Sequence, residues 1–187
     1  MHWKTKAACF RILGAIPFGS NLHFLAQRHV TRTWPRSAEH VEALVDVARK
    51  TINEFRALST EQLPSSTFLE IGAGRDLTVP LALRMLGVGK ILTTDVKRLA
   101  KLDLVNAAAK MVAAELAAPI PEFKSWSQLE AFGISYQAPF DASTEALPDI
   151  SAFVSNEVLE HVPPAVLRAI FAKVATRMRP GAVSCIA

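Results

Sequence analysis

The chain has 187 residues, 50% of them hydrophobic, and a formal net charge of +4. This length predicts one domain with room for a small appendage, and the composition allows a substantial core. No apolar run is long enough to span a bilayer, and Arg11 interrupts the apolar stretch near the N-terminus, which argues against a cleavable signal peptide. Cys9 and Cys185 have no metal-ligand or redox spacing, which fits a reducing, cytoplasmic location.

The positive charge is concentrated at the N-terminus. Residues 1–36 contain six Lys and Arg and no Asp or Glu, so the rest of the chain carries 15 basic and 17 acidic side chains. Aromatic residues are interleaved with these charges, namely Trp3, Phe10, Phe18, Phe24 and Trp34. Such an arm favours an anionic contact, which can be a membrane surface, a phosphorylated substrate or nucleic acid. The alternative is an ordinary helical lid whose aromatic side chains pack on the core.

The elements predicted in chain order begin with a long helix and then alternate between strands and helices. Ser37 is a suitable N-cap, and apolar residues at helical spacing predict an amphipathic helix over residues 38–58. Strands are predicted at 67–71, 90–94, 134–136, 151–155 and 182–187. Helices are predicted at 76–86, 97–117, 125–132 and 163–178, the last with Val166, Ile170, Val174 and Met178 as its buried stripe. This order predicts a doubly wound, Rossmann-like α/β fold with a mostly parallel sheet.

Glycine and acidic residues follow the predicted strands at one edge of this sheet, where ligands of such folds bind. Gly72 and Gly74 come directly after the first strand, and the missing side chains let a ligand approach the backbone closely. The helix that follows offers free N–H groups at its start. We interpret this turn as a site for a nucleotide-like cofactor.

The acidic residue before the glycines, Glu70, helps to choose among nucleotide-like cofactors. A dinucleotide site favours G-x-G-x-x-G, and Leu77 stands in the position of its third glycine. Glu70 would also repel a pyrophosphate, whereas S-adenosylmethionine carries a sulfonium and an ammonium group and has no phosphate. Asp95 closes the second strand, and its carboxylate, which only accepts hydrogen bonds, can take both hydroxyls of a ribose.

From about residue 66 to its end, the chain resembles the class I S-adenosylmethionine-dependent methyltransferases. The first motif of that family matches Glu70-Ile-Gly-Ala-Gly74, with Asp76 where the family often has a third glycine, and the acidic residue of the second strand matches Asp95. Asp141 matches an acidic residue that faces the adenine amino group in the family.

The later motifs also match. The segment Ser155–Val162 resembles the motif of the fourth strand, and Arg179-Pro-Gly181 resembles the turn before the fifth. The resemblance implies S-adenosylmethionine as cofactor. The cofactor-binding residues that it implies are Glu70, Gly72, Ala73, Gly74, Asp76, Asp95, Val96, Asp141, Ala142, Ser155 and Asn156.

The family sheet has seven strands in the order 3-2-1-4-5-7-6, and this sequence stops in the fifth. We therefore expect a C-terminally truncated class I methyltransferase fold that lacks its last strands. Residues 1–62 are expected to form an N-terminal helical arm and lid, and residues 63–187 the cofactor-binding domain. The acceptor pocket of such a fragment can be incomplete, and the fragment can be inactive.

The segment after the fourth strand supplies the candidates for catalysis, Glu157, Glu160 and His161. A hydroxyl acceptor needs a base or a metal to remove its proton. On one helix these three residues would share a face and could ligate a divalent cation. A fourth ligand is missing downstream, so we expect no metal, and His161 is a candidate base or a structural residue.

The sequence thus predicts an S-adenosylmethionine-dependent methyltransferase, with O-methylation of a small-molecule, glycan or lipid-linked acceptor as the preferred reaction. One alternative is an RNA methyltransferase whose basic arm binds phosphates, and RNA binding should then weaken steeply with salt. Another is a catalytically inactive, cofactor-binding scaffold that regulates a partner.

Overall fold

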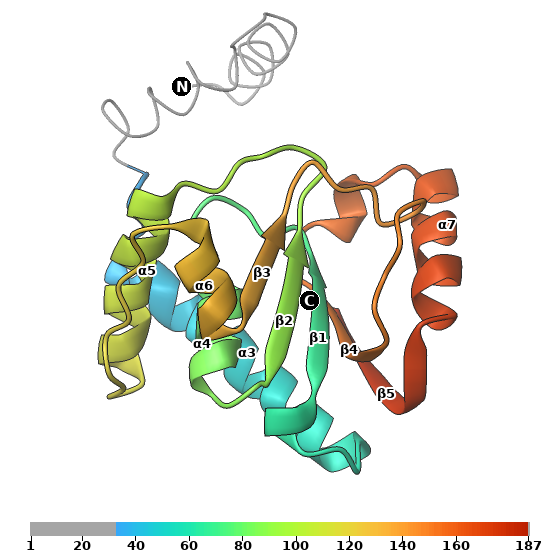
Figure 1. Ribbon diagram of the computed structural model, residues 1–187, viewed down its shortest axis with the longest axis horizontal. Helices are drawn as coiled ribbons and strands as arrows, with labels where there is room; N and C mark the ends of the chain where they lie inside the picture. The colour runs from blue at the N-terminus through green and yellow to red at the C-terminus, as the bar shows by residue number, and fades with distance from the viewer. Residues whose placement is uncertain (1–32, 187) are drawn as a thin grey trace, which may run out of the picture. The chain divides into compact units, whose positions relative to one another are not determined.

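The computed structural model describes residues 33–186, and Figure 1 shows how their elements are arranged. The predicted basic arm lies outside the described residues, except for residues 33–36. In this short stretch the Arg36 guanidinium lies 4.7 Å from the centroid of the Trp34 ring. Residues from Ala38 onward form one compact unit. No helix within residues 33–186 has the length and apolar character needed to cross a membrane.

In the described part of the chain, the strands form one parallel sheet in the order β3-β2-β1-β4-β5 (Figure 1). The strands are β1 (Thr67–Ile71), β2 (Lys90–Thr94), β3 (Ile134–Gln137), β4 (Ile150–Ser155) and β5 (Met178–Ile186). Ile71 pairs with Thr94, so β1 and β2 end side by side at the same edge. The order is that of the first five strands expected from the sequence, and the predicted fold class is confirmed.

Helices cover both faces of the sheet. They are α3 (Ala38–Leu58), α4 (Thr78–Met85), α5 (Leu102–Glu115), α6 (Trp126–Phe132) and α7 (Pro164–Ala175). Phe68 belongs to a buried apolar cluster that includes side chains of α3, α4 and α5. Leu69 belongs to a second cluster that includes Ile170 and Val174 of α7. Successive side chains of a strand point to opposite faces, so the two clusters lie on opposite sides and the fold is doubly wound.

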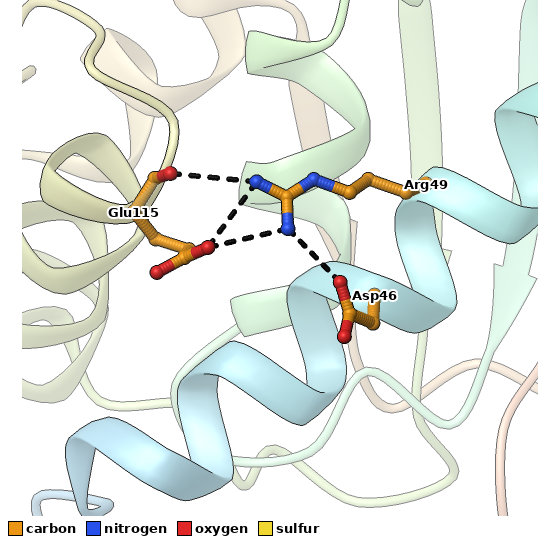
Figure 2. Close-up of polar contacts among 3 residues, drawn as sticks. All are labelled: Asp46, Arg49 and Glu115. Carbon is orange, nitrogen blue, oxygen red and sulfur yellow. Dashed lines mark hydrogen bonds and ion pairs between the residues drawn. The ribbon is translucent and has the colours of Figure 1, made fainter.

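The first described helix, α3, has the predicted bounds and shares the core of the sheet. Phe55 is fully buried, and its ring centroid lies 5.0 Å from that of Phe68 in β1. Figure 2 shows Arg49 of α3 between Asp46 and Glu115, at 2.9 Å from Asp46 Oδ1 and 3.2 Å from Glu115 Oε1. Because this ion pair is largely exposed, it orients α3 against α5 more than it stabilises the fold.

Two helices begin two or more residues later than predicted. The helix expected at 97–117 begins at Leu102, because the N–H groups of Leu99 and Ala100 donate to the Tyr136 hydroxyl, at 3.0 and 3.2 Å. These contacts with a distant strand hold residues 96–101 as a loop. The helix expected at 76–86 begins at Thr78, after Leu77, whose φ of 54° is left-handed and not helical.

The predicted buried stripe of α7 was wrong at Val166, which is 40% exposed. Leu167 packs against the second cluster in its place, together with Ile170 and Val174. The helix ends at Ala175, three residues before the predicted end, because the chain turns at Arg177 into β5.

The last strand begins at Met178 and not at the predicted residue 182. Ile150 pairs with Met178, whereas Ala152 pairs with Val183, so residues 179–182 bulge between two rungs of the ladder. Proline has no N–H to give to the ladder at position 180, and Gly181 has a φ of 79°. The predicted turn is therefore a bulge inside β5.

Substitution of Phe55 tests whether α3 is an integral part of this core. Phe55→Ala should lower the free energy of unfolding by about 3–5 kcal/mol, because it leaves a cavity against Phe68. Leu58→Ala on the same helix is the matched control, since Leu58 is 69% exposed and its loss should change stability by ~0.5 kcal/mol or less. Urea denaturation measures both, and equal effects would contradict the packing described for α3.

Candidate functional site

The loop that follows β1 has two glycines with different surroundings. Gly72 and Gly74 have φ values of 94° and 72°, in the left-handed region that favours glycine. A Cβ on Gly72 would lie 2.2 Å from Val158 Cγ2, whereas a Cβ on Gly74 would meet no atom within 4 Å. The N–H groups of Gly72 and Ala73 both donate to the Thr94 carbonyl, at 2.9 and 3.2 Å. Gly72 is thus required by packing, and Gly74 borders open space.

Asp95 follows β2 directly and lies beside this loop. Its Oδ2 atom is buried and has no hydrogen-bond partner. Burial raises the pKa of Asp95 to about 7, although hydrogen bonds from the Gly74 N–H and the Tyr136 hydroxyl and the charge of Arg75 lower it. A buried oxygen without a donor is unfavourable, and a ligand that supplies hydroxyl groups would relieve it.

Glu70 lies inside β1, below the glycine loop. It is 3% exposed, and the Thr93 hydroxyl donates to its Oε2 atom. Burial raises the pKa of Glu70 to about 8; the Thr93 hydrogen bond lowers it, and the charges of Asp95 and Asp76 raise it. Glu70 is therefore mainly protonated at neutral pH in the free protein.

Asp76, at the position of the family's third glycine, is also buried, with 4% exposure. Its Oδ1 accepts the Thr78 N–H at 3.4 Å, so it supports the start of α4 from one residue before the N-cap. Leu77 at the N-cap is fully buried in a left-handed conformation, and the Thr78 hydroxyl is buried without a partner. The left-handed non-glycine residue of the loop is therefore Leu77, one position after Asp76, where the family often has a glycine.

The segment after β4 is joined to the end of β1. Ser155 is buried, and its hydroxyl donates to the Ile71 carbonyl at 3.1 Å. Asn156 is partly exposed, and Glu157 is exposed with a left-handed φ of 53°. Val158 then reaches over Gly72. This segment forms one wall of the site.

The three catalytic candidates do not lie on one helix, as a metal site on a shared face would require. Glu157 precedes a short 3₁₀ turn, η2 (Leu159–His161), which contains Glu160 and His161. The imidazole Nε2 lies 3.7 Å from Glu160 Oε1, and the two side chains are 78% and 57% exposed. Within residues 33–186, no group of three or more His, Cys, Asp and Glu is arranged to hold a metal. The catalytic roles of the three residues remain predictions.

The remaining predicted residues are Val96, which follows Asp95 directly, and Asp141 and Ala142, which approach Asp95 only in the folded chain. Val96 is 75% exposed and presents an apolar surface next to Asp95. The Phe140 N–H donates to the Asp95 carbonyl at 2.9 Å, which brings the following residues to the same edge. Asp141 is exposed, and the Ser143 hydroxyl and N–H donate to its Oδ1 at 2.6 and 2.9 Å, which lowers the pKa of Asp141. Ala142 is buried in the second apolar cluster.

Sequence reasoning missed Arg75, Tyr136 and Val158. Arg75 is half-buried, which lowers its pKa, and its charge acts on Asp95. Tyr136 is the single tyrosine of the chain and lies one residue before the end of β3, next to β2, which could have indicated a polar role. Nothing in the sequence indicates that Val158 covers Gly72, since the two residues meet only in the folded chain.

No family model matches the chain, and no curated protein matches it in sequence. Solved structures of other proteins resemble it at a distance. PKMT2 from Rickettsia typhi in complex with AdoHcy is 14% identical, with a TM-score of 0.47 over 74% of this chain and 23% of that chain. The glycopeptide N-methyltransferase MtfA complexed with (S)-adenosyl-L-methionine is 20% identical, with a TM-score of 0.47 over 72% and 49%.

A third structure, magnesium protoporphyrin IX methyltransferase (ChlM) from Synechocystis PCC 6803 with bound SAM, is 13% identical, with a TM-score of 0.49 over 88% of this chain and 73% of that chain. The present chain spans about a quarter of the length of PKMT2 and about half of that of MtfA. A function proposed for it therefore depends on its own residues.

Alanine substitutions at Gly72 and Gly74 should show which glycine is required by packing and which borders open space. Gly72→Ala should lower the free energy of unfolding by about 2–4 kcal/mol, because it combines left-handed strain with the contact to Val158. Gly74→Ala should cost only the strain, about 1–2 kcal/mol. Thermal or urea denaturation without ligand measures both. Equal destabilisation would show that Val158 does not lie over Gly72.

The buried Glu70 predicts a loss of stability as the pH rises from acid to neutral. Its pKa is raised from 4.5 to about 8 in the folded state, so the folded protein binds more protons than the unfolded one between these values. Stability should therefore fall as the pH rises from 4.5 to 8, by at least ~1 kcal/mol from this group.

Glu70→Gln removes this titration and should flatten the pH dependence over that range. Glu130→Gln, on the exposed side of α6, is the control and should follow the wild type. Urea denaturation at several pH values measures the difference. A wild-type protein that becomes more stable over the same range would contradict a protonated Glu70.

Proposed function

We propose that the chain binds S-adenosylmethionine at the carboxyl edge of β2, β1 and β4 and positions an acceptor for transfer of its methyl group. The observation that carries this proposal is the buried, unpartnered Oδ2 of Asp95 beside the open space at Gly74. A ribose would supply the missing donors to Asp95 while the adjoining part of the cofactor crosses the glycine loop.

The charges around the loop fit S-adenosylmethionine better than a dinucleotide. Three acidic residues lie on or beside the glycine loop, namely Glu70, Asp76 and Asp95. The negative charges of the two aspartates raise the pKa of Glu70. A pyrophosphate placed there would add negative charge to an acidic, desolvated surrounding. A cationic ligand without phosphate would be stabilised by the same groups.

Other residues of the edge have roles in this proposal. Val96, exposed next to Asp95, would pack against the adenine, and Asp141 would face its amino group. The backbone of Gly72, Ala73 and Gly74 would lie along the amino-acid part of the cofactor. Ala142, Ser155 and Asn156 would complete the walls on the two sides.

The order of the strands would set the orientation of the cofactor on the sheet. With the ribose at the end of β2 and the cofactor across the loop after β1, its sulfonium end points toward the segment after β4. The cofactor supplies a methyl group on a good leaving group, so the residues mainly position the acceptor and exclude water. Glu157, Glu160 and His161 lie in that segment, and the exposed imidazole is free to accept a proton from a hydroxyl acceptor.

Transfer to oxygen on a small-molecule, glycan or lipid-linked acceptor is the form of the reaction that we prefer. It is supported by the acid–base groups after β4 and by the basic, aromatic composition of residues 1–36. A cytoplasmic location, with contact to a membrane surface through that arm, belongs to the same proposal.

Calorimetry with S-adenosylhomocysteine on Asp95→Ala tests the cofactor site. Loss of the ribose hydrogen bonds to a charged acceptor should weaken binding by about 1.5–3 kcal/mol, which is roughly 10- to 150-fold. Asp149→Ala is the control, because Asp149 precedes β4 at the opposite edge and pairs with Arg177 there. An unchanged affinity of Asp95→Ala, or tight binding of NAD by the wild type, would contradict the proposal.

A further inference from the structure

We propose that Glu70 is a proton-coupled counter-charge, which is neutral in the free protein and releases its proton when a cationic cofactor binds to the glycine loop. This inference rests on the proposed function and adds a residue that responds to the sulfonium. Glu70 does not need to touch the cofactor, since it would act on the cofactor's charge through the field of its own carboxylate.

The position of Glu70 supports this role. It is 3% exposed, it lies two residues before Gly72, and the Thr93 hydroxyl of β2 is its hydrogen-bond donor. The charged groups that act on it are the carboxylates of Asp95, after β2, and Asp76, in the loop. It shares a strand face with Phe68, where α3 and α4 contribute apolar side chains to the core. These surroundings favour the neutral acid.

A cation on the loop changes this balance. Charges interact strongly in a desolvated site, and a nearby positive charge favours the ionised carboxylate. Both ligands carry the ammonium and carboxylate of their amino-acid part, and S-adenosylmethionine differs from S-adenosylhomocysteine in charge by its sulfonium. Glu70 would lose its proton to the buffer, and no bond of the cofactor would form or break. More protons should therefore be released by S-adenosylmethionine than by S-adenosylhomocysteine.

Asp95 makes a separate contribution that does not depend on the sulfonium. It is faced by the Gly74 N–H, the Tyr136 hydroxyl and the Arg75 side chain, and the Arg98 guanidinium lies 5.6 Å from the Tyr136 ring centroid. The two ribose hydroxyls donate to the ionised Asp95, so their binding also releases a proton from this group. Both ligands carry the same ribose, and this part of the release should be equal for them.

Calorimetry of the whole chain in buffers of different ionisation enthalpy counts the protons released at pH 7. In the wild type, S-adenosylmethionine should release ~0.5 proton more per binding event than S-adenosylhomocysteine. Glu70→Gln should abolish this difference and keep the release that both ligands share. Glu130→Gln, on the exposed face of α6, should behave as the wild type.

A second measurement needs the wild type alone and covers the case in which Glu70→Gln does not fold. The ratio of the two affinities should shift in favour of S-adenosylmethionine by about 3- to 10-fold between pH 6 and pH 8.5. Equal proton release by the two ligands, a pH-independent ratio, or a difference that survives in Glu70→Gln would overturn the inference and leave the cofactor site intact. Failure of both ligands to bind the wild type would overturn the proposed function, and this inference with it.

Discussion

The contact between Gly72 and Val158 is the constraint on which the arrangement of the site depends. It brings the segment after β4 over the loop after β1, and the bond from the Ser155 hydroxyl to the Ile71 carbonyl joins the same two strands. Any side chain at position 72 would separate them. With Val158 on one side of the loop, the open approach to the backbone lies at Gly74, on the side of Asp95.

Two carboxylates are desolvated at this edge of the sheet. Glu70 is buried inside β1 and an oxygen of Asp95 has no donor, and burial is the largest influence on the pKa of both groups. Such groups make the free protein less stable than an apolar edge would, and a ligand with a ribose and a positive charge would reverse both penalties. Stability and ligand choice thus depend on the same side chains.

Much of the fold was predictable, because hydrophobic periodicity and turn residues are local signals. The bounds of α3, β1 and β2 agree with the sequence prediction, since each has a clear pattern and a clear stop. The start of α5 was not predictable, because the Tyr136 hydroxyl takes two N–H groups from the loop that precedes it. Val166 was assigned to the buried stripe because helical spacing alone does not fix which face meets the sheet.

The site was predictable only in part for the same reason. The glycines and Asp95 could be found because they stand at fixed spacings from strands that the sequence marks. The roles of Tyr136 and Val158 arise from contacts between residues far apart in the chain. The condition for a shared face of Glu157, Glu160 and His161, a single helix, is not met, because Glu157 is left-handed and a short 3₁₀ turn follows.

A crystal structure of the chain with bound S-adenosylmethionine would show whether the ribose meets the unpartnered oxygen of Asp95. We expect both ribose hydroxyls within hydrogen-bond distance of the Asp95 carboxylate, with Oδ2 now partnered and the sulfonium on the side of β4. A ligand bound at another part of the surface, or one at this edge whose ribose leaves Asp95 Oδ2 without a donor, would contradict this expectation.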